Sequence, residues 1–212
     1  MDSLNHEKAF RGQPALDRLA SASIVVCGAG AVGSNLVDTL ARQGAKKLRV
    51  IDRDRVEPHN VATQVYLAEQ AGQWKVEALR DLVFRATGIE IDAMRQELTP
   101  KNVAKLLASA DLVVDGFDNS ASRRAVTEAC AATGLPCLHV GLNAGYAEIR
   151  WNERYRVPSD AEGDVCDYPL ARNLVLIVAG AAAETALKWL CEKRKEDRSV
   201  TLLDLRINEE NE

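Results

Sequence analysis

A glycine-rich turn near the start of the chain constrains its fold more than any other feature. A short β-branched run at residues 23–27 leads into the turn GAGAVG at 28–33, and residues 34–43 have helical periodicity. Gly44 ends that helix, and residues 47–52 have the composition of a second strand. Strand, helix and strand in this order form a right-handed βαβ unit, so we predict a parallel sheet.

The turn has the spacing of a phosphate-binding loop. Gly28, Gly30 and Gly33 carry no side chains that would keep a ligand away from the backbone, and N–H groups at the start of the next helix favour an anion. Asp52 ends the second strand 19 residues after Gly33, where a carboxylate can accept hydrogen bonds from ribose hydroxyls. These residues predict a nucleotide site for either ATP or NAD. The alternative is a turn that serves only helix–sheet packing.

Helical and strand patterns alternate along the rest of the chain. We expect a loop at 53–69, helices at 74–87, 99–107, 121–133 and 170–193, and strands at 89–94, 111–115, 136–142, 146–151 and 200–206. The predicted fold class is α/β, with a Rossmann-like, mostly parallel sheet that has helices on both faces and is extended by C-terminal strands of mixed direction. A length of 212 residues, of which 47% are hydrophobic, fits one domain.

Composition and charge exclude several classes of partner. The net charge of -4 provides no basic field for nucleic acid, so we expect no nucleic-acid partner. The most apolar run, at 174–183, has about half of the roughly 20 residues of a membrane helix, so we expect a buried core helix and no membrane partner. The five cysteines lack CxxC spacing, and residues 1–11 show no signal-peptide pattern, which predicts a cytoplasmic location.

A longer pattern of spaced polar residues follows the second strand. It begins with DRDRVEPHN at 52–60 and continues with Gln64, Lys75 and the Asp-Asn pair at 118–119. In this pattern the chain resembles the ThiF family, the ubiquitin-activating-enzyme-like adenylyltransferases, over about residues 12–143. The combination of motifs is much more specific than the glycine turn alone.

The resemblance implies ATP-dependent adenylation of the C-terminal glycine of a ubiquitin-like or sulfur-carrier protein. It implies Mg²⁺ as a cofactor and a homodimer. Many relatives hold a structural zinc through two CxxC pairs, which this chain lacks, so we expect no zinc. It also implies one adenylation domain over 1–212, with a nucleotide-binding core at 22–141 and a crossover loop at 157–168. The residues that match the family's nucleotide site are Gly28, Gly30, Gly33, Asp52, Asp54, Asn60, Gln64, Lys75, Asn119 and Arg123.

Three of the matching residues have more specific implied roles. Lys75 would contact phosphates, where a point charge neutralises developing negative charge. Asp118 would bind magnesium, which prefers carboxylate and phosphate oxygens. Arg123 would order the loop that contains Asp118. The alternatives are a solvated helix lysine at position 75 and a helix N-terminal cap at position 118.

One departure from the family pattern affects the expected activity. Where the family usually reads Asn-x-x-Arg-Gln, this chain has Thr63 in place of the arginine. Losing such a donor at a developing charge commonly costs about 10² to 10³ in rate, with Arg53 and Arg55 the nearest cations in sequence to replace it. Arg11 is the stand-in for an N-terminal arginine that relatives insert into a partner subunit's site.

Cys166 is the candidate nucleophile in the crossover loop, where it would accept the activated acyl group as a thioester. The other cysteines fall in predicted strands and helices, where burial keeps a thiol inert. The alternative is a small residue packed under the loop.

Two other functions stay open. A non-catalytic homologue that acts as a scaffold or partner subunit is favoured by Thr63. An NAD-dependent oxidoreductase is favoured only by the glycine turn and Asp52.

Overall fold

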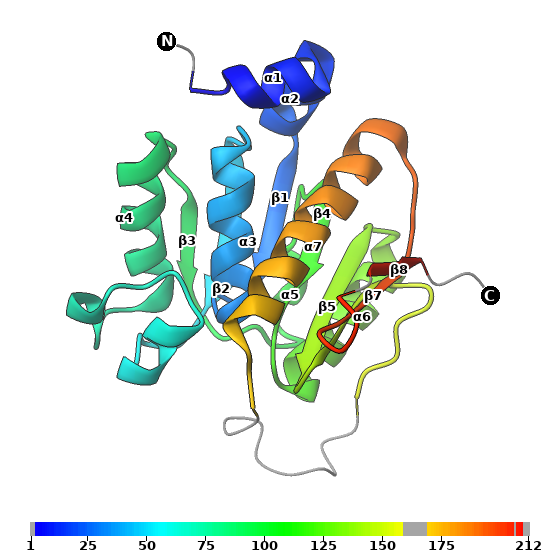
Figure 1. Ribbon diagram of the computed structural model, residues 1–212. Coiled ribbons are helices and arrows are strands. Elements are labelled where there is room, and N and C mark those ends of the chain that lie inside the picture. Colours follow the sequence, from blue (N-terminus) through cyan, green and yellow to red (C-terminus); the bar gives the residue numbers. More distant parts are fainter. Residues whose placement is uncertain (1–2, 159–168, 206, 210–212) are drawn as a thin grey trace.

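The computed structural model in Figure 1 describes residues 3–158, 169–205 and 207–209. Its strands form an eight-stranded sheet in the order β3-β2-β1-β4-β5-β6-β7-β8. From β3 to β5 neighbouring strands are parallel, whereas β6, β7 and β8 each pair antiparallel with the strand before. The strands are β1 (Ser23–Cys27), β2 (Lys47–Asp52), β3 (Asp92–Arg95), β4 (Leu112–Asp115), β5 (Cys137–Asn143), β6 (Tyr146–Trp151), β7 (Arg198–Thr201) and β8 (Ile207–Glu209).

Helices cover both faces of this sheet, as predicted. Helices α3, α4 and α7 contribute to the core on one face, and α5 and α6 contribute to the core on the other. The helices are α1 (Asn5–Arg11), α2 (Gln13–Ser21), α3 (Ala31–Arg42), α4 (Lys75–Thr87), α5 (Val103–Leu106), α6 (Ser120–Thr133) and α7 (Arg172–Glu192), with short 3-10 turns η1 (Pro58–Ala62) and η2 (Ala68–Gln70). The predicted α/β fold class is therefore confirmed.

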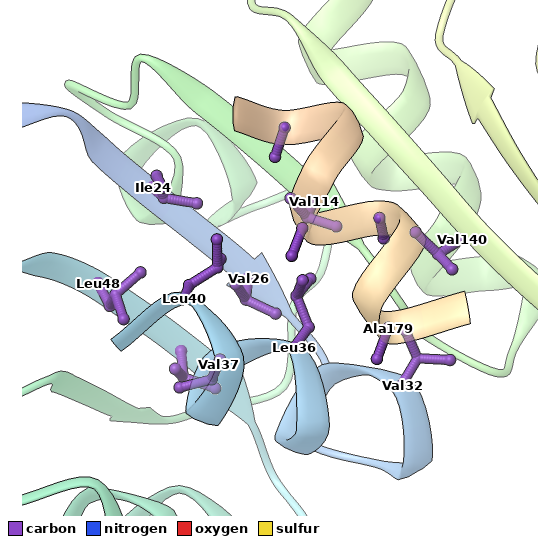
Figure 2. Packing of buried hydrophobic residues seen from close by; sticks show 14 of the residues in the cluster. Ile24, Val26, Val32, Leu36, Val37, Leu40, Leu48, Val114, Val140 and Ala179 are labelled. Atoms are coloured by element: carbon purple, nitrogen blue, oxygen red, sulfur yellow. The ribbon is translucent and has the colours of Figure 1, made fainter. Parts of the chain in front are cut away.

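The larger core lies under α3 and α7 (Figure 2). Leu36 and Leu40 of α3 belong to one buried cluster with Val26 of β1 and Ala179 of α7. Full burial of such a leucine stabilises the fold by about 1.5–3 kcal/mol. Helix α7 is long and apolar enough to cross a membrane, but 56% of its most apolar window is buried in the fold, as the prediction of a core helix requires.

The register of the central strands brings three chain turns to one edge of the sheet. Cys27, the last residue of β1, pairs with Ile51 of β2 on one side and with Asp115 of β4 on the other. Because the three strands are parallel and end together, the segments that follow them meet at their carboxyl ends. Helices α1 and α2 lie at the opposite end of β1 (Figure 1).

Two predicted elements, one strand and one helix, are longer than the elements in the structure. Of the strand expected at 200–206, only the first two residues belong to a strand, β7, and the separate strand β8 pairs antiparallel with it. The Thr201 hydroxyl accepts a hydrogen bond from the Leu203 N–H (3.1 Å), and Leu205 has a φ of 56°, so the chain turns instead of extending. The helix expected at 99–107 is only α5, because Asn102 Oδ1 accepts from the Thr99 N–H (2.8 Å) and holds a turn before it.

Two smaller differences concern the loop after β2 and the third strand. The loop expected at 53–69 contains the 3-10 turn η1 and the start of η2. The strand expected at 89–94 is β3, which begins and ends later. Neither difference changes the order of the elements.

Candidate nucleotide-binding site

Gly28 and Gly33 make the turn after β1 possible. Gly28 has a φ of +96°, and a Cβ there would lie 3.1 Å from the Gly116 carbonyl oxygen. A Cβ on Gly33 would lie 1.9 Å from the Gly28 carbonyl oxygen, which no side chain allows. The two glycines therefore pack the turn against the start of its own helix and against the segment that follows β4.

Gly30 differs from these two glycines because a Cβ there would meet nothing within 4 Å. It is the N-cap residue of α3, and no side chain caps that helix. The N–H groups of the first helical turn and the helix dipole therefore favour an anion next to an open glycine backbone. This is the arrangement that the sequence predicted for phosphate.

Asp52 fixes the glycine turn from the end of β2. Its carboxylate is 7% exposed and accepts hydrogen bonds from the N–H groups of Ala29 and Asp54, both at 2.7 Å. Burial raises the pKa of Asp52, although Lys75 and the two N–H groups oppose the shift. An ionised carboxylate has more acceptor sites than these two bonds use, so Asp52 can still accept from a ribose.

Lys75 is the first residue of α4, where the helix dipole disfavours a cation. Its side chain is only 12% exposed, its Nζ lies 3.6 Å from Asp54 Oδ2, and its charge acts on Asp52. The alternative of a solvated helix lysine is therefore wrong. Asp54, by contrast, is exposed and holds α4 through its carbonyl oxygen, which accepts from the Lys75 N–H (2.9 Å).

The segment around η1 contains the predicted residues Asn60 and Gln64. Asn60 is 6% exposed, and its Oδ1 accepts from the Glu57 N–H (2.9 Å), so the side chain shapes this turn. Gln64 is 8% exposed, and its Oε1 is buried with no hydrogen-bond partner among the described residues. A buried acceptor of this kind is costly unless another donor reaches it.

Two hydrogen bonds hold this segment over the glycine turn. Asn35 Nδ2 of α3 donates to the Thr63 carbonyl oxygen (3.0 Å), and the Tyr66 hydroxyl donates to the Ala29 carbonyl oxygen (2.7 Å). Tyr66 is 2% exposed, so this contact is part of the core. The predicted residues of the η1 segment are thereby brought to the start of α3.

Asp118 follows β4 and lies exposed just before α6. The N-cap of α6 is Asn119, whose Oδ1 accepts from the Ser122 N–H (2.9 Å). The interpretation of Asp118 as a helix cap is therefore wrong, and its carboxylate is available to a cation. The cap bond uses the side-chain oxygen of Asn119, which the resemblance had assigned to the nucleotide.

Sequence reasoning missed a buried charged cluster beneath Asp118. Asp115 and His139 are fully buried, with Asp115 Oδ2 2.8 Å from His139 Nδ1, and the Asp115 Oδ1 accepts from the Phe117 N–H (3.1 Å). Burial raises the pKa of Asp115, but Arg123 and His139 outweigh this and leave that pKa below its ordinary value. Polar residues inside two apolar strand patterns were the available signal.

Arg123 belongs to this cluster. Its guanidinium is 3.7 Å from Asp115 Oδ2 and donates to the Tyr155 hydroxyl (2.8 Å) and the Val140 carbonyl oxygen (2.9 Å). With 8% exposure, the Arg123 guanidinium is held inside the protein by these three partners, and its roles as a nucleotide contact and in ordering the loop that contains Asp118 stay predictions.

The burial of the cysteines agrees only in part with the prediction. Cys166 lies outside the described residues. Cys27, Cys130 and Cys137 are buried as expected, but Cys191 is exposed, contrary to the prediction.

Arg11 forms ion pairs within its own chain. It pairs with Glu7 (2.6 Å) inside α1 and with Glu184 (2.8 Å), which joins α1 to α7. Within the described part of the chain, no group of three His, Cys, Asp or Glu side chains is placed to hold a metal.

These features define an α/β protein with an uncapped helix N-terminus, a buried aspartate and a largely buried lysine at the carboxyl ends of its central strands. The model of the ThiF family matches residues 4–211. The chain therefore belongs to the ThiF family.

Relatives of known activity match part of the chain. It is 37% identical over 123 residues to the adenylyltransferase and sulfurtransferase MOCS3 of Bos taurus, covering 57% of this chain and 27% of that protein. It is 35% identical over 135 residues to the sulfur carrier protein adenylyltransferase of Thermus thermophilus, covering 60% and 48%. The chain thus matches about a quarter to a half of the length of these relatives.

Solved structures share the fold over nearly the whole chain. The structure of E. coli MccB with ATP superposes with a TM-score of 0.81, covers 97% of this chain and 69% of that chain, and is 17% identical. The E. coli tRNA N6-threonylcarbamoyladenosine dehydratase TcdA with AMP gives a TM-score of 0.78 at 21% identity and covers 90% and 95%. At these identities the likeness establishes the fold.

Proposed function

We propose that this protein binds Mg·ATP at the carboxyl ends of β1, β2 and β4 and adenylates the C-terminal glycine of a ubiquitin-like or sulfur-carrier protein. The observation that carries the proposal is the convergence of Gly30, Asp52 and Lys75 around the start of α3. Each has the chemistry that one part of a nucleotide requires. The names of the relatives in Bos taurus and Thermus thermophilus agree with this reaction.

The proposed reaction needs positioning and charge neutralisation more than acid–base chemistry. A carboxylate oxygen of the partner's C-terminus attacks the α-phosphorus of ATP, the bond from that phosphorus to the bridging oxygen breaks, and pyrophosphate leaves. No proton has to be removed from an ionised carboxylate. Lys75, held beside Asp52 and Asp54, supplies positive charge for the phosphates.

Asp118 is the residue that would hold Mg²⁺. Its carboxylate is exposed, it is not used as the cap of α6, and a single carboxylate together with phosphate oxygens suits this ion. When bound, the ion would neutralise charge on the phosphates.

Titration calorimetry with Mg·ATP and, separately, with NAD tests the nucleotide. We expect binding of ATP but not of NAD, and an affinity for Mg·ATP about 10-fold weaker in Asp118→Ala. Asp81→Ala, an exposed acid on α4, is the matched control and should leave the affinity unchanged. Binding of NAD alone would favour an oxidoreductase instead.

A non-catalytic scaffold is the second candidate function. It is favoured by Thr63 and by the positions of the two predicted replacement cations. Arg53 pairs with Glu97 (2.6 Å), and Arg55 stacks on Trp74 with its guanidinium 3.7 Å from the ring centroid. Pyrophosphate exchange with a ubiquitin-like partner separates the two functions, because a scaffold binds the partner without exchange.

Thioester formation on Cys166, the homodimer and the cytoplasmic location stay part of the proposal. A thiol-reducible adduct with the partner that is lost in Cys166→Ala, and retained in Cys191→Ala, would support the thioester. An adduct that survives in Cys166→Ala would remove it. Light scattering of the nucleotide-bound protein tests the dimer, and a monomer would count against it.

A further inference from the structure

Arg172 contacts the segment that lies over the glycine turn. It is the first residue of α7, and its Nη1 donates to the carbonyl oxygens of Ala62 (3.2 Å) and Gln64 (3.4 Å). In Figure 1 the start of α7 lies beside the loop that follows β2. An arginine far away in the sequence therefore reaches the two residues that flank Thr63.

This contact is continuous with the start of α3. The Thr63 carbonyl oxygen accepts from Asn35 Nδ2 (3.0 Å), and the same amide group donates to the Ala31 carbonyl oxygen (2.8 Å) in the first turn of that helix. Arg172, the backbone around Thr63 and the first turn of α3 thus form one hydrogen-bonded unit. The guanidinium is held close to the helix end that is proposed to face phosphate.

The charge of Arg172 is not balanced by its known contacts. Arg53 pairs with Glu97 and Arg123 with Asp115, whereas Arg172 contacts two carbonyl oxygens and forms no ion pair with any carboxylate among the described residues. Its side chain is exposed, and its place at the first position of α7 is disfavoured by the helix dipole. Lys75 occupies the equivalent position of α4. Both helices begin with a cation at the same edge of the sheet.

We infer that Arg172 binds the terminal phosphates of the nucleotide, an inference that rests on the proposed function. It supplies from α7 the positive charge that Thr63 cannot provide and that Arg53 and Arg55 direct elsewhere. During adenylation the guanidinium would stabilise the charge that develops on the departing pyrophosphate. AMP lacks these phosphates and would gain nothing from Arg172.

Comparison of ATP with AMP tests the inference. In Arg172→Gln the amide can still donate to the two carbonyl oxygens, but the charge is gone. We expect the affinity for Mg·ATP, measured by calorimetry, to fall roughly 10- to 100-fold, and the affinity for AMP to stay within about twofold of wild type. Arg85→Ala, an exposed arginine in the last turn of α4, is the control and should change neither affinity.

A second variant separates a charge effect from a purely structural effect. Adding Thr63→Arg to Arg172→Gln restores a guanidinium on the residue between Ala62 and Gln64, so ATP affinity should return to within roughly fivefold of wild type. Equal ATP affinity in wild type and Arg172→Gln, an equal loss for AMP, or no recovery in the double variant would overturn the inference. Wild-type protein that binds neither nucleotide would instead overturn the proposed function, and this inference with it.

Discussion

Asp52 and Asp115 both end strands that flank β1, and both are withdrawn from solvent, yet the protein shifts their pKa values in opposite directions. Asp52 meets two backbone N–H groups and one lysine, which do not offset its burial. Asp115 meets Arg123 and His139, which more than offset it. The Asp52 carboxylate therefore keeps acceptor sites for a ligand, whereas the Asp115 carboxylate is paired with side chains of the fold.

The difference shows that one edge of a parallel sheet can carry a ligand-binding side and a structural side next to each other. The side of β1 next to β2 presents backbone N–H groups and an incompletely satisfied carboxylate. The side next to β4 places a neutralised cluster under the loop that carries Asp118. The first arrangement suits binding, and the second fixes the position of the binding loop.

Removal of the Asp115 carboxylate should give the largest effect. Asp115→Ala leaves the Arg123 guanidinium buried without its counter-charge and His139 Nδ1 without its hydrogen-bond partner, so we expect a loss of about 3–5 kcal/mol in the free energy of unfolding, measured by urea denaturation. Glu128→Ala, an exposed acid on α6, should change it by less than about 0.5 kcal/mol. A loss below about 1 kcal/mol in Asp115→Ala would show that the cluster is not structural.

Matched amide variants sharpen the comparison. Asp52→Asn keeps one acceptor oxygen and removes a charge whose burial is unfavourable, so the free energy of unfolding should fall by no more than about 1 kcal/mol. Affinity for both ATP and AMP should fall about 10-fold, because both carry the ribose. Asp115→Asn should destabilise the protein by more than Asp52→Asn. If the two variants lose equal stability, the assignment of a binding role to Asp52 and a structural role to Asp115 is wrong.

The pH dependence of stability should have opposite signs at the two positions. The folded-state pKa of Asp115 lies below its ordinary 3.8, so its stabilisation is present above pH 3.8 and is lost as pH falls through the folded-state value. The folded-state pKa of Asp52 lies above 3.8, so its contribution is full below pH 3.8 and is lost as pH rises through the folded-state value.

Urea denaturation between about pH 3 and pH 6 measures both signs. As pH falls, the stability of wild type relative to Asp115→Asn should shrink, and its stability relative to Asp52→Asn should grow. Slopes of the same sign for the two pairs would contradict the assigned directions.

The smallest effect is expected at Asp54. Its pair with Lys75 is at 3.6 Å, and Asp54 is 55% exposed, so Asp54→Asn should cost less than about 1 kcal/mol in thermal or urea unfolding. The cost should decrease further in high salt. A larger loss would mean that Asp54 belongs with the buried carboxylates.

The glycine turn and the aspartate that ends β2 could be predicted because their sequence patterns are local. A glycine turn between a β-branched run and a periodic helix leaves few alternative structures, and an aspartate at the end of the next strand is placed by the same βαβ unit. The cluster around Asp115 could not be predicted in this way. Its members come from β4, α6, β5 and the segment after β6, and only the order of strands in the sheet brings them together.

Local patterns were sufficient to predict the α/β fold class, the parallel order of elements and the glycine turn, because hydrophobic periodicity and glycine conformation act over a few residues. Only the folded chain shows that Asn119, not Asp118, caps α6, that Arg123 faces inward, and that Arg172 reaches the backbone around Thr63. These outcomes depend on burial and on which distant segments share an edge of the sheet, so the free energy of packing selects them and local preference does not.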